Sequence, residues 1–201
     1  MADVVVTSGG ACARVVVRAG PTAAAAIGTV FGVRLSEAPC RANVHGDRAA
    51  LWLGPDEWLL LAPERDGPAV LASIAEAVGE APASVVDVSH RTIAIDVQGV
   101  RCGDALNAFC ALDLHPDAFP VGMCTRTLFG KAEIILWRTA GDAFRLEVAR
   151  SFGSYLQGCL AEAMREFMLP FAGESVIASS ASDEAISRPA RDCFGRSAAS
   201  Q

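Results

Sequence analysis

Hydrophobic residues in the first part of the chain follow strand and helix periodicities in turn. Residues 13–19 are rich in valine and predict a β-strand, and Gly20-Pro21-Thr22 is typical of a helix start, so a helix is expected over 22–31. Apolar residues three and four positions apart predict a second helix over 66–78. Short apolar runs separated by glycine-containing turn signals predict strands at 41–46, 48–54 and 57–62.

The remainder of the chain, up to residue 168, shows a similar order of elements. A helix is expected after Gly99, and a longer amphipathic helix with a wide apolar face over 151–168. A proline-containing loop over 113–122 separates the first of these helices from the strands that follow. The strands expected in this part are 83–89, 91–98, 123–129, 132–138 and 143–149.

The two halves of the chain align with each other. Gly20 corresponds to Gly99, Gly46 corresponds to Gly130, and the apolar residues after the first glycine pair fall at matching positions. The pattern is βαβββα twice, with a linker and strand at 79–92. It predicts an α+β fold in which helices pack on mostly antiparallel sheets. We therefore expect one repeat over 1–80 and a second over 81–168.

The C-terminal segment 169–201 has a different character. It is rich in serine and has little periodicity, which is typical of an extended or flexible tail. An arm that wraps around a partner is the functional alternative.

Composition narrows the classes of function. The net charge is −6, which argues against non-specific binding to nucleic acid. No apolar run approaches the roughly 20 residues of a membrane-spanning helix, and the start shows no secretory signal, so a cytoplasmic protein is expected. The mean hydropathy of +0.33 is high, and the cations are arginines apart from Lys131. An apolar interface with a partner explains both features, as does a high-GC genome.

Metal and redox chemistry are poorly supported. The seven cysteines include no CxxC pair, and the three histidines show no zinc-ligand spacing. Reduced, mostly buried thiols are the expectation, with redox chemistry as the alternative.

The segment Asp87-Val-Ser-His-Arg91 invites a catalytic-triad interpretation. In a strand, however, Asp87 and Ser89 share one face and His90 points to the other, and no nucleophile-elbow motif is present. A turn closed by Asp87 and Ser89, with His90 capping the backbone, is the favoured interpretation.

Two further features could recognise a partner or a ligand. The loop at 112–122 is rigid because of its prolines and could present Phe119 as an apolar anchor, or it could simply connect two layers. Trp52, Trp58 and Trp137 could stack on a flat ring such as a pterin or flavin, although a place in the core or an interface is favoured. No dinucleotide-binding fingerprint is present.

The sequence resembles the gamma subunit family of bacterial heterotetrameric sarcosine oxidases. The likeness covers roughly residues 10–168 and rests on four stretches: LWLGPDEWLLL at 51–61, DVSHRT at 87–92, LDLHPDAFPVG at 112–122, and 137–152. Asp87-Val-Ser-His90 is also similar to the "DVSH" of aminomethyltransferases, so the resemblance implies an aminomethyltransferase-like fold. Those folate enzymes carry an acidic pair after a glycine turn, where this chain has only Glu133.

The resemblance implies a structural subunit without a catalytic, cofactor-binding or metal-binding residue of its own. The complex would contain alpha, beta, gamma and delta subunits, with this chain packing chiefly on alpha. It would convert sarcosine to glycine and hydrogen peroxide and, with tetrahydrofolate, form methylenetetrahydrofolate. FAD, FMN, NAD, tetrahydrofolate and zinc would be held by the partner subunits.

The expected contact regions are the 112–122 loop, the end of the DVSHR segment and the outer face of the last helix. The residues assigned to this contact are His90, Arg91, His115, Pro116, Phe119 and Pro120. The alternative function is a free-standing folate-binding protein or enzyme of the aminomethyltransferase type, which requires a pocket between the repeats lined by Glu133 and a tryptophan.

Overall fold

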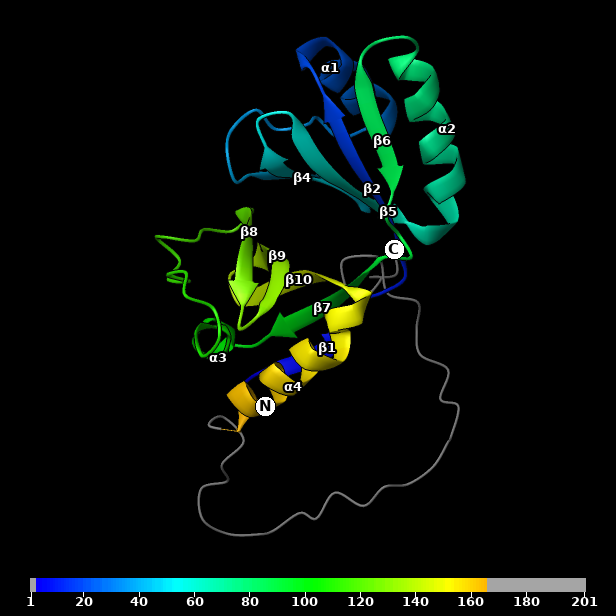
Figure 1. Cartoon of the computed structure of the whole chain (residues 1–201). Coiled ribbons are helices and arrows are strands. Elements are labelled where there is room, and N and C mark those ends of the chain that lie inside the picture. Colours follow the sequence, from blue (N-terminus) through cyan, green and yellow to red (C-terminus); the bar gives the residue numbers. More distant parts are fainter. Residues whose placement is uncertain (1–2, 166–201) are drawn as a thin grey trace, which may run out of the picture.

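Two antiparallel five-stranded sheets form the centre of the molecule (Figure 1). The computed structural model describes residues 3–165. The first sheet has the order β3-β4-β5-β2-β6, with β2 (Cys12–Ala19), β3 (Ala42–His45), β4 (Arg48–Gly54), β5 (Glu57–Pro63) and β6 (Ala83–Asp87). The second has the order β1-β7-β10-β9-β8, with β1 (Val5–Ser8), β7 (Thr92–Gln98), β8 (Cys124–Phe129), β9 (Ala132–Ala140) and β10 (Ala143–Ala149).

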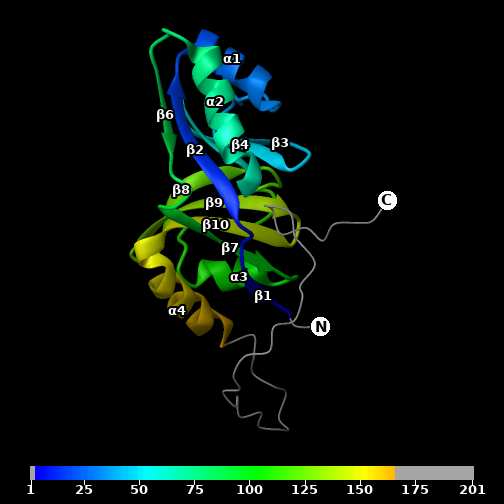
Figure 2. The same cartoon turned by 90° about the vertical axis from the view of Figure 1, so that its right-hand side faces the viewer.

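Two helices cover the outer face of each sheet, so the molecule has four layers (Figures 1 and 2). The helices α1 (Pro21–Phe31) and α2 (Gly67–Val78) pack on the first sheet, and α3 (Cys102–Asn107) and α4 (Gly153–Met164) pack on the second. The single 3-10 turns η1 (Glu64–Asp66) and η2 (Arg150–Phe152) lead into α2 and α4.

The inner faces of the two sheets pack against each other. Leu51 and Leu59 of the first sheet share an apolar cluster with Cys124 and Trp137 of the second. Alternate residues of each strand point the opposite way, into the helix-covered cores. Both faces of both sheets are therefore covered, which explains why β5 and β10 are buried along nearly their whole length.

Each sheet contains one strand that comes from the other sheet's part of the chain. β1 precedes β2 in the chain but pairs with β7 of the second sheet, whereas β6 precedes β7 but pairs with β2 of the first. The chain passes so close to β7 after β1 that a Cβ on Gly9 would lie 2.5 Å from the Cβ of Ala94, so a glycine is required there. The two sheets consequently do not correspond to the two halves of the sequence.

The predicted α+β class and antiparallel sheets are confirmed. The structure has strands and helices at all the predicted places, and Gly46 and Gly130 both adopt positive φ in matching hairpin turns. β1 was not predicted, and the helix after Gly99 is only six residues long. The assignment of 1–80 and 81–168 as separate repeats remains a prediction, and the tail at 169–201 lies outside the described residues.

Candidate functional site

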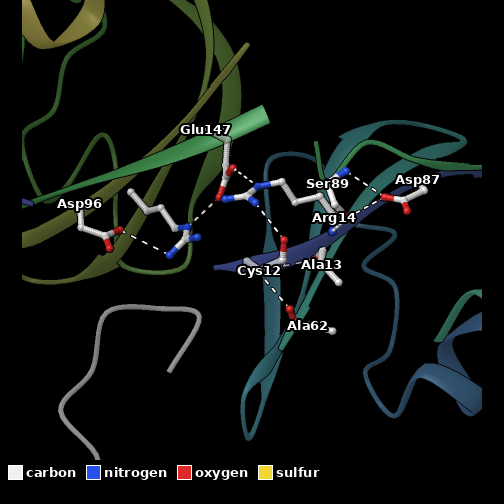
Figure 3. A network of polar contacts seen from close by, with 9 residues as sticks. Cys12, Ala13, Arg14, Ala62, Asp87, Ser89, Asp96 and Glu147 are labelled. Carbon is white, nitrogen blue, oxygen red and sulfur yellow. Dashed lines mark hydrogen bonds and ion pairs between the residues drawn. The ribbon is translucent and has the colours of Figure 1, made fainter. Parts of the chain in front are cut away.

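A chain of buried charges joins the inner faces of the two sheets (Figure 3). Arg14 of β2 donates from Nε to Glu147 Oε2 of β10 at 2.6 Å, and Arg145 donates from Nε to the other Glu147 oxygen at 2.7 Å. Arg145 Nη1 lies 3.5 Å from Asp96 Oδ1 on β7. All four side chains are at most 5% exposed. Two cations and two anions thus form an ion network with no net charge between the layers.

The network fixes the ionisation of its members. Burial alone would raise the pKa of Glu147, but Arg145 and Arg14 outweigh burial and hold this pKa below its usual value. Burial would lower the pKa of Arg145, but Glu147 and Asp96 outweigh it and raise that pKa. Both Glu147 oxygens accept hydrogen bonds from guanidinium groups, so this carboxylate is a structural anion rather than an available general base.

The Asp87–Arg91 segment forms a turn that connects β6 of the first sheet to β7 of the second. Asp87 Oδ1 accepts hydrogen bonds from the Ser89 backbone N–H at 2.9 Å and from the Ser89 hydroxyl at 2.6 Å. The Ser89 hydroxyl accepts from the Arg14 backbone N–H at 2.9 Å. The hydrogen bond from the Ser89 side chain is the main cause that lowers the pKa of Asp87. The predicted turn closed by these two residues is therefore present.

His90 and Arg91 are exposed beside this turn. The carbonyl of His90 accepts a hydrogen bond from Arg150 Nε at 2.9 Å, and the carbonyl of Arg91 accepts one from the Arg150 backbone N–H at 2.8 Å. These contacts hold the turn against the start of η2. Both residues are exposed, and their place in a partner contact stays a prediction.

The 112–122 loop is divided between surface and core. His115 and Pro116 are exposed and Pro120 is half-buried. Phe119, by contrast, is 1% exposed and packs with its ring centroid 6.0 Å from that of Phe144 in the chain's own core. We therefore remove Phe119 from the expected contact surface: it anchors the loop to the second sheet and not to a partner.

Arg138 holds this loop from beneath, a role the sequence analysis missed. It is 5% exposed, and its Nη1 donates to the carbonyls of Leu114 at 3.2 Å and Phe119 at 2.9 Å. Its guanidinium also lies over the Phe144 ring, 5.0 Å from the centroid. An arginine within an apolar strand pattern was the available signal, because such a cation is retained only when its donors find acceptors.

One tryptophan lies in the core, and the other two line a cavity. Trp137 lies in the apolar cluster between the sheets. Trp58 is 3% exposed and donates from Nε1 to the Ser36 carbonyl at 2.8 Å, and Trp52 is half-buried. Trp52 and Trp58 both line a cavity of about 880 Å³ beside α1, which the sequence did not indicate.

The folate alternative requires a pocket between the repeats that is lined by Glu133 and a tryptophan. A small polar cavity of about 170 Å³ does lie between the layers, at the crossing of the two inter-repeat segments. Neither this cavity nor the larger one includes Glu133, which is exposed on β9. Glu133 therefore lines neither of these two cavities together with a tryptophan.

The thiols match the expectation of mainly buried cysteines. Cys102, Cys110 and Cys124 are buried free thiols, and Cys40 and Cys159 are half-buried free thiols. Burial raises the pKa of Cys124 to about 12. Within residues 3–165 no group of three or more His, Cys, Asp or Glu side chains could hold a metal ion. No helix in that same range is long and apolar enough to cross a membrane.

Comparison with known proteins identifies the family. A model described as "Sarcosine oxidase, gamma subunit family" matches residues 16–166. The chain belongs to the sarcosine oxidase gamma subunit family. It is 36% identical over 151 residues to sarcosine oxidase subunit gamma of Corynebacterium sp. (strain U-96), covering 74% of this chain and 72% of that one. It is 33% identical over 147 residues to subunit gamma of Arthrobacter sp., covering 73% and 70%.

Solved structures agree with this assignment. Heterotetrameric sarcosine oxidase from Corynebacterium sp. U-96, in complex with pyrrole 2-carboxylate, contains a chain that matches with a TM-score of 0.78 and 32% identity, covering 86% of this chain and 88% of that one. Aminomethyltransferase T of the glycine cleavage system from Bartonella henselae matches with a TM-score of 0.61 and 13% identity, covering 79% and 45%. The second match shows the fold alone and confirms the aminomethyltransferase-like architecture.

Proposed function

We propose that this chain is the gamma subunit of a heterotetrameric sarcosine oxidase and that it supports the large alpha subunit without catalysing a step itself. With the beta and delta subunits, the complex oxidatively demethylates sarcosine to glycine and hydrogen peroxide, and with tetrahydrofolate it forms methylenetetrahydrofolate. FAD, FMN, NAD, tetrahydrofolate and zinc belong to the partner subunits in this proposal, and the complex is cytoplasmic.

One observation carries this proposal. The structural match to the heterotetrameric enzyme from Corynebacterium extends over 86% of this chain and 88% of the matched chain, at a TM-score of 0.78. A likeness over nearly the whole of both chains leaves little room for a different domain arrangement. Membership of the gamma subunit family over residues 16–166 supports the same assignment.

The state of the polar side chains supports a structural role. A general base or nucleophile must have a free acceptor within reach of a substrate. Glu147 has both oxygens engaged by arginines, and Asp87 Oδ1 accepts two hydrogen bonds from Ser89, which hold Asp87 and Ser89 within their own turn. The groups that resemble catalytic residues are therefore used to fix the turn and the contact between the sheets.

The surface offers apolar residues for an interface. Val121 in the 112–122 loop is 54% exposed and Leu128 on β8 is 58% exposed. Phe152 at the end of η2 and Tyr155 in the first turn of α4 are 43% and 36% exposed. Stable assemblies bury such residues over about 2,000 Å² or more. We place His90, Arg91, His115, Pro116 and Pro120 in the contact with the alpha subunit.

Co-expression of the four subunits, with and without this chain, tests the proposal. We expect the complex that contains this chain to oxidise sarcosine and release hydrogen peroxide. Without it, we expect less soluble alpha subunit and a proportional loss of activity, with unchanged turnover per assembled flavin. A complex of normal yield and stability in the absence of this chain would contradict a supporting role. A complex that assembles without this chain and binds sarcosine, but has a lower turnover per flavin, would contradict a non-catalytic role.

A further inference from the structure

The large cavity of the first repeat is an apolar hollow on the helix side of the first sheet. Its volume is about 880 Å³. Helix α1, the segment after it and the β4–β5 hairpin contribute the walls. The lining residues on which the argument below depends are Ala25, Thr29, Arg34, Leu35, Trp52 and Trp58.

The second repeat shows what fills the equivalent space there. Trp52 pairs with Trp58 across β4 and β5, and Arg138 pairs with Phe144 across β9 and β10. Each pair lies next to the turn of its own hairpin, so Arg138 and Phe144 occupy the places in the second sheet that Trp52 and Trp58 occupy in the first. The walls of the cavity therefore have counterparts around Phe119.

In the second repeat this space is occupied by the chain itself. Leu114, which aligns with Leu35, lies in the same core cluster as Phe119 and Phe144. The loop that carries Phe119 is longer than its counterpart between Leu35 and Gly46. Phe119 fills the second repeat from within, and the shorter loop of the first repeat contains no phenylalanine, tyrosine or tryptophan that could do so.

We propose that the cavity of the first repeat receives an aromatic side chain on a loop of a partner subunit, which fills it as Phe119 fills the second repeat. The inference deepens the proposed function and rests on it, because it assigns one docking point between this chain and the alpha subunit. A buried aromatic anchor in a preformed pocket is a frequent source of binding energy at interfaces.

The charges around the cavity suit an uncharged aromatic segment. Asp56 accepts two hydrogen bonds from Arg18 at 2.9 and 3.1 Å, and Arg34 lies 3.6 Å from Glu37 at the exposed edge. The edge therefore has no net charge to attract an ionic ligand. The guanidinium of Arg34 is 82% exposed, so its N–H groups are placed to bind carbonyls of an entering loop, as Arg138 binds the carbonyl of Phe119.

A matched pair of variants in the four-subunit complex tests this assignment. Ala25 is exposed on α1 and lines the cavity, so Ala25→Trp places an indole where the partner's side chain would enter. Ala75 is exposed on α2 and lies outside the cavity lining, so Ala75→Trp is the control. We expect Ala25→Trp to weaken assembly at least tenfold in a concentration series and Ala75→Trp to leave it unchanged. Each isolated variant is compared with the isolated unaltered chain, and an equal unfolding temperature shows that the fold is intact.

Photocrosslinking identifies the occupant. p-Benzoylphenylalanine at Thr29, which lines the cavity, is expected to crosslink to an aromatic-containing segment of the alpha subunit in the purified complex. Normal assembly of Ala25→Trp, or a crosslink confined to this chain's own residues, would overturn the proposal while the subunit assignment stands. Failure of the unaltered chain to assemble would instead overturn the proposed function.

Discussion

Glu147→Gln is the most informative single change to the interior. The substitution preserves the shape of the side chain but removes the negative charge that both Arg14 and Arg145 contact at 2.6 and 2.7 Å. The network changes from two cations and two anions to two cations and one anion. Because Glu147 is 2% exposed, water does not replace the lost charge.

The expected loss of stability follows from this burial. Removal of one partner from a buried ion pair costs about 3–5 kcal/mol, and a domain of this size has a total stability of roughly 5–15 kcal/mol. At about 2–4 °C for each kcal/mol, the melting temperature is expected to fall by roughly 6–20 °C. Glu162→Gln is the matched control, because the Glu162–Arg165 pair is exposed and such pairs contribute about 0–1 kcal/mol.

The pH dependence gives a second readout. The pKa of Glu147 is lower in the folded than in the unfolded chain, so its contribution is fully present above the usual glutamate value of 4.5 and is lost as the pH falls through the folded value. The difference between the native chain and Glu147→Gln is therefore expected to shrink on acidification below that value.

Urea denaturation read by pulse proteolysis measures both effects, in the isolated chain or in the complex. A Glu147→Gln variant within 1 kcal/mol of the native chain at pH 7 would refute the reasoning. So would a difference that grows as the pH falls.

Two further substitutions and one labelling reaction test separate parts of the structure. Phe119→Ala is expected to destabilise the chain by about 3–5 kcal/mol, and Val121→Ala, which is 54% exposed, by less than about 0.5 kcal/mol; similar urea midpoints would place Phe119 outside the core. Cys124 is buried and has a thiol pKa of about 12, so we expect it to react with iodoacetamide at pH 8 far more slowly than half-buried Cys159 in the folded chain. Peptide mass spectrometry measures both rates, and equal rates before unfolding would contradict the burial of Cys124. Gly99→Ala places a Cβ against the backbone carbonyl oxygen of Asp3 at a φ of +132°, so a loss of several kcal/mol is expected. A melting temperature equal to that of the native chain would contradict this close approach.

The element order was predictable because each repeat has strong local patterns. The turn glycines Gly46 and Gly130, the proline at the start of α1 and the spacing of apolar residues in α2 are all read within short windows. β1 was missed because it has only four residues and its pairing partner, β7, lies far along the chain. Strand exchange between repeats leaves no local signal.

The interior charges and the cavity were not predictable for a related reason. A charged residue such as Arg14 in a strand indicates a solvent-exposed face when only one sheet is considered. The second sheet covers that face, and the charges are tolerated because Glu147 and Arg145 meet there from another part of the chain. Phe119 shows the converse, because an aromatic residue in a polar loop indicated a surface anchor. In the structure Arg138 binds its carbonyl and Phe144 packs against its ring, so that Phe119 is buried in the core.

Affinity purification of this chain from its native source tests the central claim most directly. The purified material would be examined by native mass spectrometry and absorbance spectroscopy. A complex of four different chains with a flavin spectrum, containing one copy of this 20.9 kDa chain, is the result that the account predicts. A lone, colourless chain of 20.9 kDa would contradict it.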